Sequence, residues 1–134
     1  SVPPSLVMAQ AANESAWGTS RFAKKAYNLF GQWCFKQGCG LVPARRNAGT
    51  NHEVRKFKSP QASVTSYIHN INTRRAYAGL RKLRAQKRAA NAPITGYDLA
   101  GGLTKYSERG QEYVKEIRSM IRYNKLAQYD NSVK

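Results

Sequence analysis

The chain has 134 residues, of which 41% are apolar, so length and composition fit one compact domain and leave little room for a second. Its formal net charge of +16 comes from 23 lysines and arginines against 7 acidic residues, and this field implies an anionic partner. The sequence contains no run of 18 apolar residues, which excludes an ordinary membrane-spanning helix. We therefore expect a single domain over residues 1–134 that acts on or binds a polyanion.

The first part of the chain predicts two short helices and an aromatic turn. Residues 4–13 are apolar on nearly every side and begin with proline, which is typical of a short buried helix that ends before Gly18. Thr19 or Ser20 can cap a second helix over residues 21–26. The next five residues, 27–31, read Tyr-Asn-Leu-Phe-Gly and indicate a turn with buried aromatic side chains.

The middle of the chain predicts a loop, a strand and a helix. Residues 32–51 show no hydrophobic period and contain several glycines and prolines, so we expect a loop. The partial alternation over residues 53–58 favours a half-exposed strand, as one arm of a small hairpin. Ser59 and Pro60 then provide a helix start. The apolar residues that follow share one helical face: Val64, Tyr67, Ile68 and Ile71.

The last part of the chain predicts two longer helices. Thr73 can cap the first, which ends near Asn91 and carries most of the basic residues between positions 74 and 88 on its surface. A helical turn over residues 97–100 precedes the final helix, from about 109 to 126. Its expected buried residues are Tyr113, Ile117, Met120 and Ile121. The fold class is therefore mainly α (α+β), with five or six helices and a small β-hairpin lobe.

Cys34 and Cys39 are five residues apart, and glycines beside Cys39 permit a tight turn that brings the sulfurs together. We favour a disulfide and an oxidising compartment. The alternatives are two free thiols in a cytosolic protein and a metal site. Only His52 and His69 could complete a metal site, and their spacing fits no zinc motif. We expect neither a metal nor a cofactor.

The seven acidic residues can be compared one by one. Asp98 is expected on the surface of a short helix, and Asp130 lies in a polar tail. Three glutamates lie four residues apart near the start of the final helix, where the dipole and nearby cations explain them: Glu108, Glu112 and Glu116. None of these five acids suggests catalysis.

Glu14 differs because it lies at the C-terminal end of an apolar helix, where the dipole and poor solvation both raise the pKa of a carboxyl group. A carboxylic acid that stays neutral at about pH 6 to 7 can protonate the oxygen of a leaving sugar. The alternative is a glutamate that forms an ion pair with Arg21 or Lys25. The position of Glu14 in the helix, taken alone, favours the ion pair over a catalytic role.

Two sequence blocks around Glu14 match a known signature. Residues 9–23 read Ala-Gln-Ala-Ala-Asn-Glu-Ser-Ala-Trp-Gly-Thr-Ser-Arg-Phe-Ala, and residues 27–31 read Tyr-Asn-Leu-Phe-Gly. Their order and spacing resemble glycoside hydrolase family 73, particularly its Bax-like branch. The resemblance continues through residues 58–67 and 103–113 and so covers nearly the whole chain. It implies a lysozyme-like fold and hydrolysis of β-1,4 bonds after N-acetylglucosamine in peptidoglycan.

The resemblance also implies catalytic roles. Glu14 matches the family's general acid, Glu53 matches a second acid that positions water from a mobile β lobe, and Tyr106 matches a tyrosine that assists the acid. From the residues alone, Glu53 is an acid in a basic strand, where a surface ion pair is the default. If Glu53 is too remote, the substrate's own N-acetyl group is the alternative nucleophile.

Substrate binding is expected at four residues. By the resemblance, Trp17, Asn28 and Phe30 shape the site. Trp33, on the loop after the second block, is the exposed candidate for stacking on a sugar ring. Ala16 stands where the family more commonly has glycine.

Two rival functions stay open. A lytic transglycosylase or a muramidase would share the fold, but a transglycosylase usually carries a Gly-Leu-Met-Gln-like block where this chain has residues 28–31. A noncatalytic basic module would bind polymer through residues 74–88 and lose affinity steeply with salt.

We favour an exported monomer of the periplasm or cell envelope. Its partner is peptidoglycan glycan strands, and we expect neither nucleic-acid binding nor membrane insertion.

Overall fold

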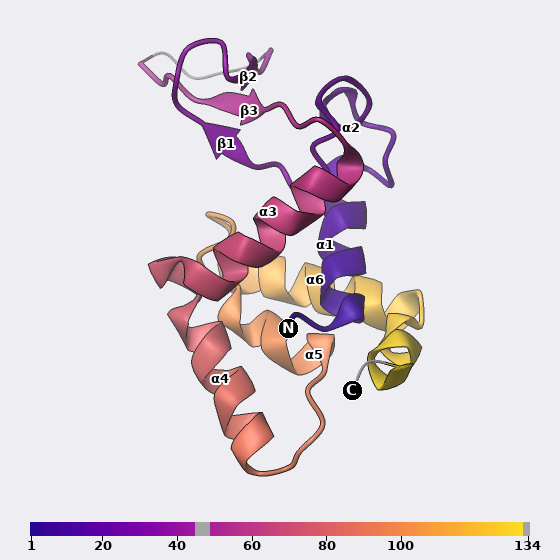
Figure 1. The fold of residues 1–134 in the computed structure, drawn as a ribbon. Coiled ribbons are helices and arrows are strands. Elements are labelled where there is room, and N and C mark those ends of the chain that lie inside the picture. Colours follow the sequence, from indigo (N-terminus) through magenta and orange to yellow (C-terminus); the bar gives the residue numbers. More distant parts are fainter. Residues whose placement is uncertain (45–48, 133–134) are drawn as a thin grey trace. The chain divides into compact units, whose positions relative to one another are not determined.

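A computed structural model of the chain describes residues 1–44 and 49–132. It divides into two compact units: unit 1 consists of Ser1–Gln10 with the chain from Ile68 onward, and unit 2 consists of Ala11–Tyr67. The boundaries fall inside helices α1 (Pro4–Ser15) and α3 (Pro60–Thr73). Six α-helices and one small sheet occur in the described residues, so the fold is mainly α with a small β lobe, as expected for a lysozyme-like protein (Figure 1).

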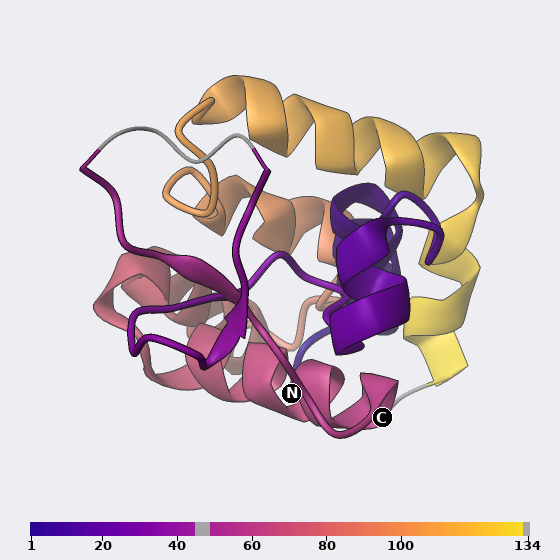
Figure 2. The same cartoon turned by 90° about the horizontal axis from the view of Figure 1, so that it is seen from above.

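Unit 1 is helical. Its elements are η1 (Arg75–Tyr77), α4 (Ala78–Ala89), α5 (Gly96–Leu99), η2 (Ala100–Gly102), α6 (Gln111–Tyr123) and η3 (Leu126–Ser132), together with parts of α1 and α3. Its core residues are fully buried aliphatic side chains: Leu6, Leu80, Leu99, Leu103, Ile117 and Ile121. Figure 2 shows η3 continuing from the end of α6 and folding back.

Asp130 holds the last turns of unit 1 in place. Its Oδ1 accepts a hydrogen bond from the Ser5 amide at 2.9 Å, and its Oδ2 accepts from the Ser5 hydroxyl at 2.6 Å and from the Gly96 amide at 3.0 Å. The expectation that Asp130 lies in a polar tail was therefore wrong. Its partners are 125 and 34 residues away in the sequence, so no local pattern could indicate them.

Unit 2 begins its second helix where the sequence predicted. Helix α2 (Arg21–Ala26) follows Ser20, whose hydroxyl accepts a hydrogen bond from the Ala23 amide at 3.1 Å. It ends at Ala26 and is followed by the capping residue Tyr27, whose φ of 54° is left-handed. In the turn that follows, Phe30 is buried as expected, but Tyr27 is exposed.

The β lobe of unit 2 is a three-stranded antiparallel sheet with the order β1-β3-β2 (Figure 1). Strands β1 (Trp33–Cys34) and β2 (Gly40–Leu41) flank the central strand β3 (Glu53–Arg55). The sequence predicted only the last strand, as part of a hairpin, because strands of two residues have no detectable period. Residues 45–48 of the predicted loop lie outside the described residues.

Three helix predictions need correction. Helix α1 continues to Ser15, two residues beyond the expected end. Thr73 is the last residue of α3 and donates to the His69 carbonyl at 2.7 Å, so it caps no following helix; α4 instead follows the turn η1. In α6, Met120 is half-buried, while Val114 belongs to the core. No helix in the described part of the chain is long and apolar enough to cross a membrane.

Candidate active site

Glu14 is the penultimate residue of α1, and the backbone that follows it is left-handed at three successive residues. The φ angles are 50° at Ala16, 58° at Trp17 and 81° at Gly18. The left-handed region costs a residue with a Cβ roughly 1–2 kcal/mol, so Ala16 and Trp17 store conformational strain. Such strain persists only where the surroundings enforce it, and it is frequent at functional sites.

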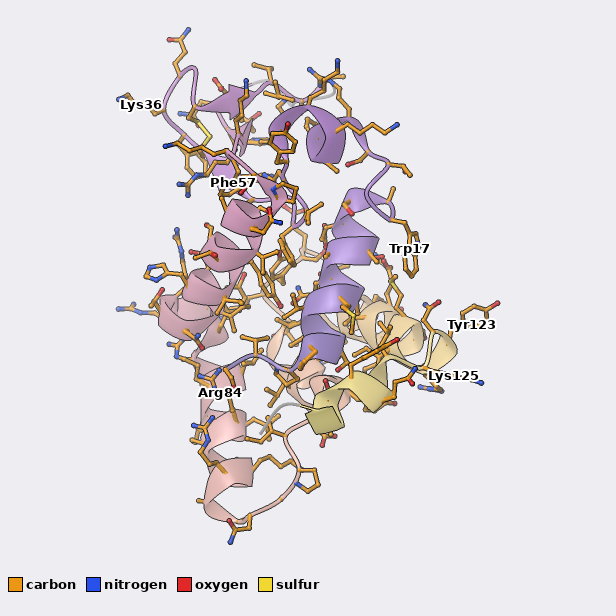
Figure 3. The ribbon with its side chains drawn as sticks, turned by 45° about the vertical axis from the view of Figure 1, so that its right-hand side comes forward. Trp17, Lys36, Phe57, Arg84, Tyr123 and Lys125 are labelled. Carbon is orange, nitrogen blue, oxygen red and sulfur yellow. A yellow bond between two sulfur atoms is a disulfide. The ribbon has the colours of Figure 1, made fainter. Side chains whose placement is uncertain are left out.

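Hydrogen bonds explain how this strained turn is held. The Trp17 amide donates to the Ala12 carbonyl at 2.8 Å, which closes the end of α1. The Gly18 amide donates to the Ser15 hydroxyl at 2.9 Å, and that hydroxyl donates in turn to the Ala11 carbonyl. The indole of Trp17 is 63% exposed and projects away from the ribbon (Figure 3).

The carboxylate of Glu14 lies against the backbone of Gly31. A Cβ atom placed on Gly31 would be 3.4 Å from Glu14 Oε2, and Gly31 has a φ of 68° that favours glycine. Glu14 itself is half-buried. The last residue of the Tyr-Asn-Leu-Phe-Gly block thus meets the acid of the first block, although 17 positions separate them in the sequence.

Asn28 organises the turn that carries Gly31. Its side chain is buried and makes four hydrogen bonds to the backbone: Nδ2 donates to the carbonyls of Gln32 and Arg55, both at 2.9 Å, and Oδ1 accepts from the amides of Phe30 and Gln32, both at 3.2 Å. Asn28 therefore joins the turn to strand β3. Its expected contact with substrate stays a prediction.

Phe30 and Gln32 connect the same turn to α3. Phe30 is buried and stacks on Tyr67 with ring centroids 4.1 Å apart. Gln32 Nε2 donates to the Ser63 carbonyl at 3.1 Å, and its Oε1 accepts from the Ser66 hydroxyl at 2.7 Å. Phe30 thus shapes the turn from the core. The role of Gln32 was not anticipated, since a lone glutamine in a loop carries no spacing signal.

Glu53 is the buried acid of the β lobe, with 5% of its surface exposed. Its Oε2 accepts a hydrogen bond from the Gly38 amide at 3.1 Å, and its Oε1 accepts from the Gly40 amide at 2.9 Å. Across the sheet, Glu53 is paired with Cys34. The residues alone predicted a surface position for Glu53, but the side chain is buried, and both of its oxygens accept charge-assisted hydrogen bonds from the backbone.

The expected disulfide joins Cys34 to Cys39, whose Cα atoms are 6.3 Å apart. It closes the loop between β1 and the start of β2, and Lys36 in this loop points outward at the edge of the lobe (Figure 3). Gly38 and Gly40, whose amides bind Glu53, lie on either side of Cys39. The disulfide loop and the Glu53 carboxylate therefore form one small structural unit.

Trp33 presents an aromatic surface on the same lobe. It is 57% exposed, stacks on the His52 ring with centroids 3.8 Å apart, and meets the exposed Phe35 edge to face at 6.5 Å. Exposed aromatic groups of this kind suit the apolar face of a sugar ring. Stacking on substrate stays a prediction for Trp33.

Tyr106 belongs to unit 1, whereas Glu14 and Glu53 belong to unit 2. Its ring stacks on Tyr113 at 5.5 Å and lies tilted against Tyr77 at 5.9 Å. The hydroxyl of Tyr113 accepts a hydrogen bond from Gln10 at 3.0 Å. Assistance of the acid by Tyr106 stays a prediction.

Two of the three glutamates near the start of α6 form the expected ion pairs, and Asp98, expected at the surface of a short helix, pairs with a lysine of α4. Lys115 pairs with Glu112 at 3.3 Å, Arg109 pairs with Glu116, and Lys87 pairs with Asp98 at 3.4 Å. Among the described residues, no group of three histidine, cysteine, aspartate or glutamate side chains could hold a metal ion.

The glucosaminidase family model, described as mannosyl-glycoprotein endo-beta-N-acetylglucosaminidase, matches residues 1–126. The chain belongs to this family. It is also 37% identical to protein bax of Escherichia coli (strain K12) over 123 residues, which are 92% of this chain and 43% of that protein. The chain thus spans less than half the length of this curated relative. No solved structure gives a significant match.

Membership of the glucosaminidase family confirms the resemblance inferred from the two sequence blocks and indicates a glycoside hydrolase that acts on a glycan. The structure also shows contacts that the two sequence blocks did not predict. The approach of Gly31 to Glu14 and the amides that bind Glu53 are backbone features. The glycines at positions 38 and 40 are the sequence signal for these backbone donors, but glycines so close together equally predict a plain turn.

Proposed function

We propose that the chain is a peptidoglycan hydrolase, an endo-β-N-acetylglucosaminidase that cleaves β-1,4 bonds after N-acetylglucosamine and works as one catalytic domain over residues 1–134. The observation that carries the proposal is the contact of the two signature blocks at one acid, Glu14, beside Gly31. The family match over residues 1–126 supports the reaction class. The strained turn after Glu14 supports a functional site at this position.

In the proposed reaction, Glu14 donates its proton to the glycosidic oxygen as the bond from that oxygen to the anomeric carbon breaks. Gly31 is compatible with this step because glycine has no side chain to place against Glu14 Oε2. The deprotonated Glu14 then recovers its proton from the water that completes hydrolysis.

We further propose that the substrate's N-acetyl oxygen attacks the anomeric carbon, giving a cyclic intermediate that water opens. The contacts of Glu53 support this route, because each of its oxygens already accepts a backbone hydrogen bond. A carboxylate stabilised in this way is a poorer base toward water. In this route Glu53 is a positioning residue that organises the β lobe. The alternative is that Glu53 acts directly in catalysis by activating water.

The proposed location is the periplasm or cell envelope after export, with peptidoglycan strands as the partner of a monomer. The Cys34–Cys39 disulfide supports an oxidising compartment. The net charge of +16 supports an anionic matrix such as the bacterial wall.

Replacement of Glu14 tests the assignment. We expect Glu14→Gln to lower the rate of peptidoglycan digestion by about 10²–10⁴-fold, the usual contribution of a general acid, while the fold is kept. Glu112→Gln is the matched control, since Glu112 forms an exposed pair with Lys115. Retained digestion by Glu14→Gln would contradict the proposal. The new reducing end should be N-acetylglucosamine; muramic acid or an anhydro sugar would instead identify a muramidase or a transglycosylase.

The same assay separates the two roles of Glu53. We expect Glu53→Gln to reduce the rate less than Glu14→Gln, because substrate assistance needs no protein base. Loss of rate equal to that of Glu14→Gln, in a variant that remains folded, would instead favour Glu53 as the group that activates water.

A further inference from the structure

A hollow of about 400 Å³ lies wholly within unit 1, between the start of α4 and η2. Its lining includes two cationic side chains, Arg75 and Lys105, the hydroxyl-bearing Thr104, and the small or apolar residues Ala78, Gly79 and Leu83. Cavities that bind small ligands are usually of this size and combine apolar lining with a few polar groups. The hollow therefore has the composition of a binding site.

The charge of the lining favours an anion. Among the described residues of the lining, the ionisable ones are Arg75 and Lys105, both exposed, and none is acidic. The surrounding segment adds to the positive field, since it carries seven basic residues and no acidic one: Arg74, Arg75, Arg81, Lys82, Arg84, Lys87 and Arg88. Burial together with Arg88 and Arg81 lowers the pKa of Arg84, which fits a strongly positive surface.

The residue types of the lining further restrict the class of ligand that fits. None of the described lining residues is aromatic, so the hollow offers no ring on which a sugar could stack. Ala78 and Leu83 suit a short apolar segment, whereas the two cations suit carboxylates at its ends. A small acidic peptide fits these features better than a sugar or a long nucleic acid, which would need an extended basic track.

Two residues of the lining are sequence neighbours of an aromatic pair that includes Tyr106, the tyrosine predicted to assist the acid. Lys105 directly precedes Tyr106, and Ala78 directly follows Tyr77, whose ring lies 5.9 Å from that of Tyr106. We propose that this hollow binds the carboxylates of the peptide stem that peptidoglycan carries on its glycan strand. This inference rests on the proposed function and adds a peptide subsite to it.

Gly79 provides a sharp test, because a Cβ atom at this position would meet no atom within 4 Å. Gly79 lines the hollow, so a side chain added there begins in open space, and leucine has a higher helix propensity than glycine. Gly102 could not serve, since its Cβ would lie 2.5 Å from Leu80 Cα. Gly79→Leu should therefore fill the hollow in a well-folded chain.

The experiment is isothermal titration of the 134-residue chain with the free stem tripeptide of peptidoglycan. We expect each of two substitutions to weaken binding by about tenfold or more. Lys105→Gln removes a charge-assisted contact, and Gly79→Leu occupies the space that the peptide needs. Two matched controls on α4 outside the hollow, Ala85→Leu and Lys82→Gln, should stay within about twofold of the parent. A tripeptide with its carboxylates converted to amides should bind at least about tenfold more weakly.

Equal binding of the acidic and amidated peptides would overturn the inference, as would Gly79→Leu binding like the parent. The Glu14→Gln variant should bind the tripeptide as the parent does, because peptide binding is measured without turnover. Failure of the peptide to bind a chain that still digests peptidoglycan would refute the subsite alone. Failure of the parent to digest any glycan would refute the proposed function instead.

Discussion

Ala16 carries a methyl group in a conformation that suits glycine, with a φ of 50° immediately after the acid-bearing helix. The resemblance to glycoside hydrolase family 73 places a commoner glycine at this position. The strain at Ala16 therefore has a simple remedy, and its cost can be measured without touching the carboxylate of Glu14.

We expect Ala16→Gly to raise the free energy of unfolding by up to about 1 kcal/mol. Removal of the Cβ relieves roughly 1–2 kcal/mol of left-handed strain, whereas the added freedom of the unfolded chain costs about 0.4–1 kcal/mol. Urea denaturation measures the difference. Ala11→Gly, inside α1, is the control and should lose about 0.5–1 kcal/mol. A similar loss in both variants would show that the turn at Ala16 is unstrained.

Single residues were predictable where their chemistry is local. Glu14 could be singled out as a candidate because few acids compete with it and because two recognisable sequence blocks surround it, although its helix-end position alone did not decide its role. Asn28 could be placed in the turn, but its bond to the Arg55 carbonyl spans 27 positions and has no sequence signal. Gln32, Gly31 and Asp130 act through similarly distant partners, so only the fold reveals what they do.

At the scale of elements, the disulfide loop and strand β3 support each other. The loop presents the Gly38 and Gly40 amides, and Glu53 on β3 accepts from both. Because the carboxylate is buried, loss of these donors would remove two hydrogen bonds from a group that is costly to bury without them. The disulfide therefore contributes to the environment of Glu53 as well as to the stability of the loop.

We expect Cys34→Ser combined with Cys39→Ser to lower the free energy of unfolding by about 2 kcal/mol, the chain-entropy value for so short a loop. A reductant should destabilise the parent by a similar amount and leave the double variant unchanged, which provides the control. If Glu53 acts through the loop, its replacement in the double variant should cost less stability than in the parent. A reductant that leaves the parent's unfolding curve unchanged would contradict this expectation.

The elements themselves were predictable to the extent that their signals are local. Helix α2 has the predicted bounds because Ser20 caps it from an adjacent position. The sheet was only partly predicted, since β1 and β2 are two residues long and pair with a strand that follows them by more than ten residues. The prediction that Thr73 caps the next helix was wrong because its hydroxyl donates to the carbonyl of His69, four residues earlier, instead of accepting a hydrogen bond from an amide of a following helix.

For the whole molecule, the excess of 23 basic over 7 acidic residues favours association with an anionic matrix such as the proposed bacterial wall. Charge of this kind attracts an anionic matrix over long distances without deciding which bond is cut. Association with the wall and cleavage of the glycan should therefore respond differently to salt.

We expect retention on purified peptidoglycan to fall strongly as the ionic strength rises from about 0.01 M to about 1 M, where the Debye length shrinks from about 30 Å to about 3 Å. Cleavage of a short uncharged oligosaccharide should change little over the same range. Co-sedimentation measures the first quantity and product release the second. Retention that does not depend on salt would show that the net charge is not what binds the wall.

The Asp130 contacts also bear on the order in which the residues of each unit become available during synthesis. Unit 2 is one continuous stretch of sequence, so all its residues are available once Tyr67 has been synthesised. Unit 1 joins the first ten residues to the end of the chain, and the carboxylate that Ser5 and Gly96 require arrives only at position 130. The family match stops at residue 126, four positions earlier. A fragment trimmed to the matched region would keep Glu14 and Glu53 yet lose the residue that fastens the two ends of unit 1 together.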